Sequence, residues 1–253
     1  MQKSAAENTQ MCLLLPAYNE EISLKKLVPR IDEILRTGYS ILVVNDGSSD
    51  GTADLCRSYS LRYPLKCISL KKNSGPGAAI SAGLEYILEK MPDIKLLVIM
   101  DADNTHEPEY IDIMVTKIRD NDIVIASRYA DKGRQIGVNL LRRFLSYTAC
   151  VLCSVMFPAE AVRDYTCGFR MYRLDFIKKY FKAKSMLPVV RRGFAANTEI
   201  LLELLRYGAR CTEIPFTLRY DLKETGSKMK IFSTVFEYFS LFIEKRFGLR
   251  KTA

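Results

Sequence analysis

The feature that most constrains this 253-residue chain is an alternation between short apolar runs and longer amphipathic segments. Apolar runs lie at residues 11–18, 41–45, 67–70, 96–100 and 122–127. Between the first two, apolar residues at positions 24, 27, 28, 31, 34 and 35 have the spacing of an amphipathic helix that ends near Gly38. Similar segments predict helices over residues 53–63, 78–91 and 108–119. Unbroken apolar strands that alternate with helices predict an α/β fold with a mostly parallel sheet, covered by helices on both faces.

The composition, 48% hydrophobic and 26% charged, is sufficient for one large domain with an appendage. We expect residues 1–10 to be disordered, residues 11–230 to form the domain and residues 231–253 to form a basic amphipathic helix. No apolar run reaches the roughly 18 to 20 residues of a spanning helix, and the N-terminus lacks the pattern of a signal peptide. These features predict a cytoplasmic protein.

Seven cysteines are scattered along the chain, several of them inside apolar runs. An odd number without regular spacing favours reduced, buried thiols over a disulfide framework. Cys150 and Cys153 form a C-x-x-C pair, but the pair lies in an apolar run with neither a second pair nor a histidine nearby. Packing inside a helix is therefore favoured over a zinc or redox site.

Charge is distributed unevenly between the two halves of the sequence. Residues 1–127 carry 14 basic and 18 acidic side chains, whereas residues 128–253 carry 24 basic and 11 acidic ones. The second half should therefore bind an anion: a nucleic acid, an acidic lipid headgroup or a phosphorylated small molecule. No nucleic-acid-binding motif accompanies the basic residues, which argues against nucleic acid as the partner.

Polar side chains follow three of the predicted strands. Tyr18, Asn19 and Glu20 follow the first, Asp46 follows the second, and Asp101 and Asp103 follow the run at 96–100. Ligands of parallel sheets bind outside the carboxyl ends of the strands, so these side chains should share one rim. Two carboxylates at such a rim suit Mg²⁺ or Mn²⁺ bound together with a phosphorylated ligand. Alternatively, Asp103 caps the next helix and Asp101 accepts backbone hydrogen bonds.

Seven segments occur in an order that resembles family 2 glycosyltransferases, specifically the branch of dolichyl-phosphate mannose and polyprenyl-phosphate glucose synthases. They are LLLPAYNEE, ILVVNDGSSDGT, NSGPGAAISAG, MDADNTHEP, IASRY, DYTCGFRMY and ETGSKMK, and they span residues 11–230. The resemblance implies a GT-A fold, which is a Rossmann-like sheet with helices on both faces. It also implies a nucleotide-sugar donor of the GDP-mannose or UDP-glucose type, Mg²⁺ or Mn²⁺, and inverting transfer to a polyprenyl or dolichyl phosphate.

The resemblance also implies roles for individual residues. The expected nucleotide-sugar contacts are Pro16, Tyr18, Glu20, Asp46, Asp101, Ala102, Asp103, Arg170, Lys223 and Lys228. The expected metal ligands are Asp101 and Asp103. The expected catalytic residues are Asp101 and Asp103 together with three that meet the acceptor phosphate, namely Arg128, Arg142 and Ser146. Arginine forks and a helix start are suited to phosphate.

Three positions depart from the family pattern. Thr105 stands where the family often has glutamine, and Cys167 stands where it usually has serine. Lys223 replaces the usual arginine with a spacing shortened by one, which leaves open whether Arg219 or Lys223 reaches the phosphate. These departures keep a catalytically idle nucleotide-binding subunit as an alternative.

The chemical class of the acceptor is indicated by the absence of an acidic residue pair that could supply a general base. A hydroxyl nucleophile requires a general base, which family members usually supply from an acidic pair, but Glu199 has no Asp neighbour. A phosphate monoester is already anionic and needs only positioning and charge neutralisation. We expect His106, the one histidine, to order the loop after Asp103. A soluble acceptor is the alternative.

Two apolar stretches, residues 138–157 and 231–243, are too short or too interrupted to span a membrane. The second is followed by the basic sequence EKRFGLRK. Apolar faces with flanking basic residues predict peripheral binding at the cytoplasmic face of a membrane. Alternatively, the two helices pack on each other, on a second copy in a homo-oligomer, or on a small membrane subunit.

Overall fold

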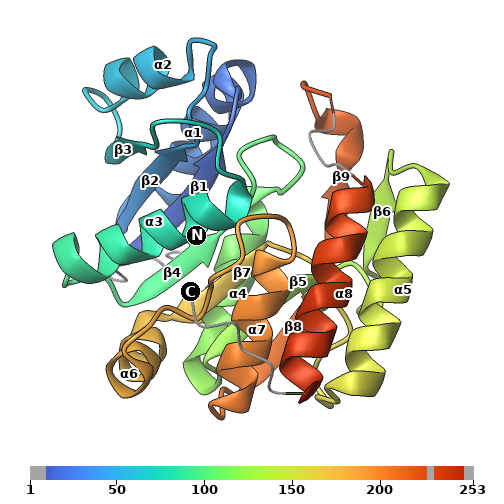
Figure 1. Ribbon diagram of the computed structural model, residues 1–253. Coiled ribbons are helices and arrows are strands. Elements are labelled where there is room, and N and C mark those ends of the chain that lie inside the picture. Colours follow the sequence, from blue (N-terminus) through green and yellow to red (C-terminus); the bar gives the residue numbers. More distant parts are fainter. Residues whose placement is uncertain (1–9, 227–230, 248–253) are drawn as a thin grey trace.

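The computed structural model describes residues 10–226 and 231–247 (Figure 1). The predicted disordered residues 1–9 and the end of the predicted C-terminal helix, residues 248–253, lie outside these ranges. The main sheet has the strand order β3-β2-β1-β4-β7-β5-β8. Its strands are β1 (Met11–Ala17), β2 (Tyr39–Asn45), β3 (Leu65–Ser69), β4 (Leu96–Ile99), β5 (Ile123–Ser127), β7 (Arg170–Arg173) and β8 (Cys211–Pro215). A second sheet pairs β6 (Arg134–Ile136) with β9 (Thr217–Arg219).

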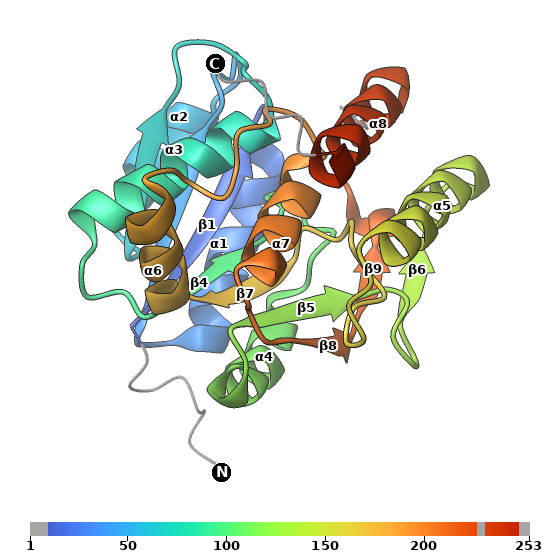
Figure 2. The same cartoon turned by 60° about the horizontal axis from the view of Figure 1, so that its bottom comes forward.

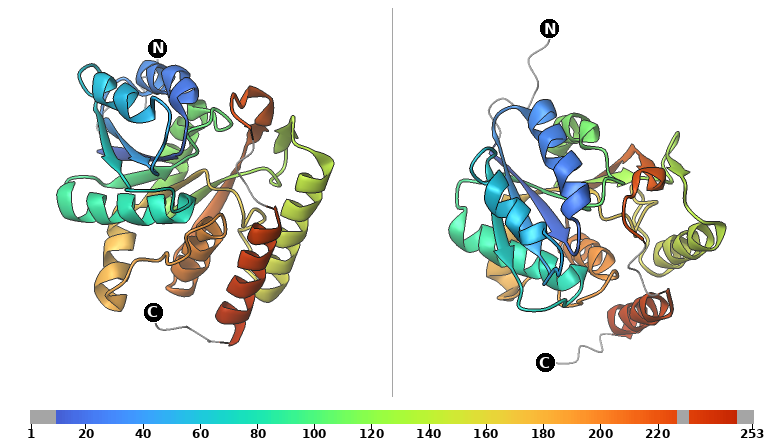
Figure 3. Two further views of the ribbon diagram at one scale, coloured as in Figure 1. Left: turned by 45° about the horizontal axis from the view of Figure 1, so that its top comes forward. Right: turned by 90° about the horizontal axis from the view of Figure 1, so that it is seen from above.

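Helices cover both faces of the main sheet, which confirms the predicted architecture. The helices are α1 (Glu21–Leu35), α2 (Thr52–Tyr59), α3 (Pro76–Lys90), α4 (Ile111–Lys117), α5 (Leu140–Met156), α6 (Leu174–Lys184), α7 (Ala196–Arg206) and α8 (Ile231–Phe247). Short 3₁₀ turns η1 (Pro108–Tyr110), η2 (Ile118–Asp120) and η3 (Tyr220–Leu222) complete the secondary structure. α3, α6 and α7 lie on one face, and α1 and α4 lie on the other (Figures 2 and 3).

The apolar runs form the buried strands that their composition predicts. Every residue from Met11 to Leu15 in β1 is fully buried, because β1 lies between β2 and β4 and has helices above and below. The predicted boundaries are confirmed to within a few residues. β2, for example, begins at Tyr39 instead of residue 41.

β7 was absent from the sequence prediction. It runs antiparallel to both of its neighbours, so that Ile99 of β4 and Ile125 of β5 both pair with Arg170. Its sequence, RMYR, lacks the apolar run that identified the other strands. Tertiary pairing on both sides therefore makes this segment a strand, and the sheet is mixed instead of wholly parallel.

α5 and α8 lie side by side at the edge of the molecule, beyond β8 (Figure 1). α8 is anchored to α7 by an ion pair in which Lys245, only 7% exposed, contacts Glu203 and also lies 3.5 Å from Glu199. Arg191 adds a second ion pair, to Glu244 at 2.6 Å. These two ion pairs connect the C-terminal end of α8, the described part of the predicted C-terminal helix, to the domain.

Both helices expose apolar side chains. On α5 these include Leu140, Phe144 and Val155, and on α8 they include Phe232 and Phe236, with exposed fractions from 65% to 92%. Among the helices of the described ranges, none combines the length and the apolar character that crossing a membrane requires. Cys150 and Cys153 are buried on α5 with free thiols, as predicted.

Candidate active site

Two adjoining cavities open where β1, β2 and β4 end. The first, which we call the sheet-edge cavity, has a volume of about 500 Å³ and is lined by residues that follow these strands. The second, which we call the helix cavity, has a volume of about 320 Å³ and extends between α5, α7 and α8. Asp101, Asp103 and Arg142 line both cavities.

The sheet-edge cavity gathers most of the predicted nucleotide-sugar contacts. Its lining includes Pro16, Tyr18, Glu20, Asp46, Asp101, Ala102, Asp103 and Lys223. Pro16 lies within β1 and Lys223 comes directly after η3, but the others follow three parallel strands, whose carboxyl ends meet at one edge of the sheet. The shared rim expected from the sequence is present.

Asp46 fixes the wall of this cavity. Its two carboxylate oxygens accept hydrogen bonds from the backbone N–H groups of Ser74 at 2.7 Å and Gly75 at 2.8 Å. Gly75 has φ +96° and its backbone lies against Arg192, so a side chain here would collide. Burial raises the pKa of Asp46 although the two hydrogen bonds oppose the shift. Asp46 therefore connects the end of β2 to the start of α3.

The Asp101–Asp103 loop is held by its neighbours. The N–H of Asp101 donates to Nδ1 of His106 at 3.0 Å, and His106 stacks on Phe169 with ring centroids 5.1 Å apart. His106 is 3% exposed, so it orders the loop, as expected. Thr105 donates from its hydroxyl to Oδ1 of Asp103 at 2.6 Å.

The second carboxylate oxygen of Asp103 contacts a lysine. Nζ of Lys223 forms an ion pair with Oδ2 of Asp103, although 120 residues separate them. Burial alone would raise the pKa of Asp103, but the charge and hydrogen bond of Lys223, together with smaller contributions such as the hydrogen bond from Thr105, lower it. Arg219 instead pairs with Asp221 at 2.9 Å and lines neither cavity. Of the two candidates, Lys223 is the one inside the site.

In the helix cavity, Arg128 follows β5 and is held rigidly by Asp164. Nε and Nη2 of Arg128 donate to the two oxygens of Asp164 at 2.8 and 2.7 Å, and the Arg128 N–H adds a third bond. Asp164 is fully buried, which would raise its pKa, but Arg128 outweighs burial and lowers it. Nη2 also donates to Thr166 at 2.6 Å, and Thr166 lies 3.1 Å from the hydroxyl of Ser146. The guanidinium is thus fixed at the cavity wall.

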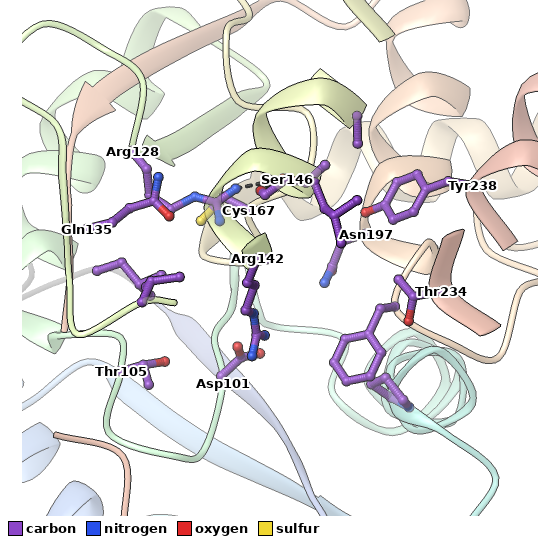
Figure 4. A pocket seen from close by; sticks show the side chains of 18 of the residues that line it. Asp101, Thr105, Arg128, Gln135, Arg142, Ser146, Cys167, Asn197, Thr234 and Tyr238 are labelled. Atoms are coloured by element: carbon purple, nitrogen blue, oxygen red, sulfur yellow. Dashed lines mark hydrogen bonds between the residues drawn. The ribbon is translucent and has the colours of Figure 1, made fainter. Parts of the chain in front are cut away.

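Arg142 and Ser146 reach the helix cavity from the first turns of α5. Nη1 of Arg142 donates to the hydroxyl of Tyr220 at 2.7 Å, and its guanidinium lies 4.8 Å from the centre of that ring. Figure 4 shows the Arg142 side chain extending toward Asp101. Arg142 therefore stands where the two cavities meet. Arg143, by contrast, is exposed.

This arrangement agrees with the comparison to known proteins. The family model described as "Glycosyl transferase family 2" matches residues 12–181, which include β1, the Asp101–Asp103 loop, Arg128 and Arg142. The chain belongs to glycosyltransferase family 2. The resemblance inferred from the seven sequence segments is therefore correct.

Among the relatives of this family 2 chain is a protein named dolichol-phosphate mannosyltransferase from Pyrococcus furiosus. It is 31% identical over 90% of the chain, and the chain spans 61% of its length. An undecaprenyl-phosphate mannosyltransferase of Micrococcus luteus is 29% identical, with 81% of each protein covered. Glucosyl-3-phosphoglycerate synthase from Mycobacterium tuberculosis, crystallised with Mn²⁺ and UDP-glucose, superposes with a TM-score of 0.68 over 98% of this chain and 82% of that chain, at 14% identity. The predicted GT-A fold is thereby confirmed.

The family 2 site fits a divalent cation. Asp101 has a half-exposed carboxylate where the cavities meet, and the Lys223 ammonium at Asp103 shows that positive charge is stabilised there. Carboxylate oxygens are ligands that Mg²⁺ and Mn²⁺ prefer. Within residues 10–226 and 231–247, no third acidic, histidine or cysteine side chain completes a metal cluster. The remaining ligands would be diphosphate oxygens and water.

Arg170 does not fit the phosphate-binding role that the resemblance implied. Its side chain is fully buried in β7, where it donates to the carbonyls of Tyr165 at 2.8 Å and of Asn197. Arg170 lines neither cavity, because its strand turns the guanidinium into the layer between the sheet and α7. It binds protein backbone. Lys228 lies outside the described residues.

Several residues of the site were missed in the sequence. Asp164 lies in the segment DYTCGFRMY but was given no role, since only the structure shows its pairing with Arg128. Asn197 of α7 lines the helix cavity, and its buried side-chain oxygen has no hydrogen-bond partner among the residues that the structure describes. Thr234 and Glu237 bring α8 into the sheet-edge cavity. For these missed residues, the sequence offered one signal: Asp164 is an acidic residue at the start of the segment DYTCGFRMY, which resembles the family.

Proposed function

We propose that this protein is a metal-dependent, inverting glycosyltransferase that moves a hexosyl group from a nucleotide-diphosphate sugar to a polyprenyl or dolichyl phosphate. One observation supports this most strongly. A cavity lined by strand-end carboxylates and Lys223 joins, at Asp101 and Arg142, a second cavity that combines fixed arginines with apolar helix faces.

The donor would occupy the sheet-edge cavity. Its nucleoside would lie near Tyr18 and Asp46, and its diphosphate near Asp101 and Lys223. When bound, a divalent cation would neutralise the leaving diphosphate. Lys223 would also neutralise the leaving diphosphate once its ammonium group moves from Asp103 to the diphosphate oxygens. The flexible lysine side chain allows this movement.

The acceptor phosphate would lie between Arg128 and Arg142. Because Asp164 and Thr166 hold Nε and Nη2 of Arg128, its remaining Nη1 group is positioned before a phosphate arrives, which lowers the cost of binding. A phosphate oxygen would attack the anomeric carbon of the sugar as the bond from this carbon to the diphosphate oxygen breaks. The nucleoside diphosphate leaves with the electron pair, and the configuration at the carbon inverts.

This reaction needs no base to deprotonate the acceptor, because the nucleophile is already anionic. Glu199, which lacks the Asp neighbour of the usual acidic pair, is 4% exposed and lines neither cavity. Its Oε2 accepts from the N–H groups of Val190 and Arg191, both at 2.8 Å. Glu199 thus supports the loop before α7.

Apolar side chains of α5 and α8 favour a lipid acceptor. The wall of the helix cavity between them is formed by Leu145, Ala149, Leu152, Val235, Phe239 and Phe242. A hydrocarbon chain attached to the phosphate could follow this wall and bury apolar surface. The exposed phenylalanines of α8 and the exposed Arg143 of α5 would bind the headgroup region of an anionic membrane at its cytoplasmic face.

A soluble phosphorylated acceptor is the second candidate. It is favoured by the fold shared with a protein named glucosyl-3-phosphoglycerate synthase. The two candidate functions differ in the role of the apolar wall between α5 and α8. A lipid acceptor would bind along this wall, whereas a soluble acceptor would not contact it. A second copy or a small membrane subunit could then cover the two helices.

The first experiment is a thermal-shift panel of UDP and GDP with and without Mn²⁺, because a ligand that binds the native state raises its stability. The second is a transfer assay with UDP-glucose and GDP-mannose, each with dolichyl phosphate, undecaprenyl phosphate or 3-phosphoglycerate. We expect Mn²⁺-dependent transfer to a lipid phosphate. Transfer to 3-phosphoglycerate alone would select the soluble acceptor, and donor binding without any transfer would select the idle subunit.

A further inference from the structure

Five acidic side chains line the sheet-edge cavity, namely Glu20, Asp46, Asp101, Asp103 and Glu237. Four of them are accounted for by contacts or by the proposed metal site. Glu20 accepts from the hydroxyl of Ser23 at 2.7 Å, and Asp46 accepts from two backbone N–H groups. Glu237 remains, and no sequence motif pointed to it.

Glu237 reaches the cavity from α8, at the far side from the strand ends. Its carboxylate lies against the backbone of Gly193, and a Cβ at that position would collide with it. Its one hydrogen bond in the described part of the chain is long, from the N–H of Ala195 at 3.4 Å to Oε2. Most of its accepting capacity is therefore unused.

The neighbours of Glu237 place it beside the junction of the two cavities. Thr234, one turn earlier on α8, lines both cavities, as does Phe194, which directly follows Gly193. In Figure 4, Thr234 faces the opening across from Asp101 and Arg142. The carboxylate thus lies close to where the group to be transferred would sit, at the level of the junction.

A carboxylate at this place is unfavourable for the anions that the site should bind. Diphosphate and acceptor phosphate are both negative, and a like charge beside them weakens binding. The Glu237 carboxylate would instead bind favourably to an uncharged ligand group that offers hydrogen-bond donors. Sugar hydroxyls meet this condition, since hydrogen bonds to a carboxylate are about twice as strong as neutral ones.

We propose that Glu237 binds hydroxyl groups of the donor's hexosyl group and thereby determines the affinity and choice of sugar. This inference rests on the proposed function, because it assumes a nucleotide-sugar donor. It assigns to α8, whose outer face carries exposed phenylalanines, a second role on its inner face. The same helix would then contact both the sugar and the lipid.

The test compares nucleotide sugars with the corresponding diphosphates by isothermal titration calorimetry in Mn²⁺. UDP-glucose, UDP, GDP-mannose and GDP are titrated into the wild-type protein, Glu237→Ala and Glu237→Gln. We expect Glu237→Ala to weaken nucleotide-sugar binding roughly 10- to 100-fold, the value of a charge-assisted hydrogen bond, and to change the Kd of the diphosphate less than about twofold. Glu237→Gln should show an intermediate loss, because an amide still accepts hydrogen bonds.

Glu244→Gln is the matched control, because it makes the same change on the same helix but outside both cavities. It removes the ion pair with Arg191 and so reports what a loosened α8 does. We expect it to leave both affinities unchanged. A drop for Glu244→Gln equal to that for Glu237→Ala would overturn the proposal, since helix anchoring would then explain both.

Two other results would also overturn it. One is an unchanged ratio of nucleotide-sugar to diphosphate affinity in Glu237→Ala. The other is lost transfer in Glu237→Gln with unchanged donor affinity, which would assign Glu237 to the chemical step. If the wild-type protein binds neither diphosphate nor nucleotide sugar, the proposed function itself fails together with this inference. The wild-type titration separates that case from the others.

Discussion

The half of the molecule built from β1–β4 and α1–α3 differs in packing from the half that carries α5 and α8. In the first, residues 11–15 of β1 are fully buried, and the side chains after the strands are held by short polar contacts such as those of Asp46. In the second, α5 and α8 expose large apolar side chains, with Phe232 at 92%. The first half is suited to a water-soluble ligand and the second to an amphiphile.

Charge follows the same division. The first 127 residues have an excess of acidic side chains and supply four of the five carboxylates of the sheet-edge cavity, whereas the remainder has a large excess of basic ones. Arg128 and Arg142 bring this positive charge into the helix cavity. Under the proposed function, the two substrates would be recognised by separate halves, which meet at Asp101 and Arg142.

The largest effect is expected in the second half, at the buried ion pair. Asp164→Asn leaves Arg128 without its counter-charge and should destabilise the protein by roughly 3–5 kcal/mol. The free energy of unfolding in urea measures this. Asp54→Asn, which alters an ion pair on the surface of α2, should change it by less than about 1 kcal/mol.

The stabilisation by Asp164 should depend on pH with a defined sign. Arg128 lowers the folded-state pKa of Asp164 below its usual 3.8, so the contribution is full above that value and declines as the pH falls through the lower folded value. The difference in stability between wild type and Asp164→Asn should therefore shrink below about pH 3.8. A difference that stays constant from pH 6 to pH 3 would contradict the assignment.

Asp101→Ala tests the junction of the two halves. Loss of this carboxylate should lower transfer by roughly 10²- to 10³-fold, because it removes electrostatic stabilisation of the leaving diphosphate. It should also abolish the increase in UDP or GDP affinity caused by Mn²⁺, measured by calorimetry. Asp54→Ala serves as control on the same half. Retention of the full Mn²⁺ effect would argue against a metal at Asp101.

The apolar helices can be tested by changing two exposed side chains of α8. Replacing Phe232 and Phe236 by serine should weaken binding to vesicles of anionic phospholipid by about tenfold, since each ring buries apolar surface in the interface. Co-sedimentation measures this. Leu61→Ser, an equally exposed apolar site in the first half, should have no effect. Equal losses for both variants would remove the distinction between the halves.

The smallest effect is expected at Cys167. Its side chain is 4% exposed at the wall of the helix cavity, and its N–H donates to Asp164 at 2.9 Å whatever the side chain is. Cys167→Ser, which restores the usual family residue, should change stability and transfer by less than about 1 kcal/mol. A large gain in transfer would mean that Cys167 lowers the activity of the wild-type protein. That result would support the alternative of a catalytically idle subunit.

The sequence by itself determined the alternation of strands and helices and the rim of polar residues after β1, β2 and β4. These depend on local periodicity and on the rule that parallel strands end together, which require no knowledge of distant contacts. The identification of the family likewise followed from short segments in order. The position of Asp101 and Asp103 at this rim could be predicted for the same reason.

Only the tertiary structure decided which charged side chains line the two cavities. Arg170 and Arg128 look alike in sequence, yet pairing of β7 with β4 and β5 buries the first, while the second ends β5 at the cavity beside Asp164. Lys223 finds Asp103 across 120 residues, and α8 brings Glu237 to a cavity that begins at β1. Such contacts depend on packing between segments that are distant in the sequence, so the local sequence pattern cannot predict them.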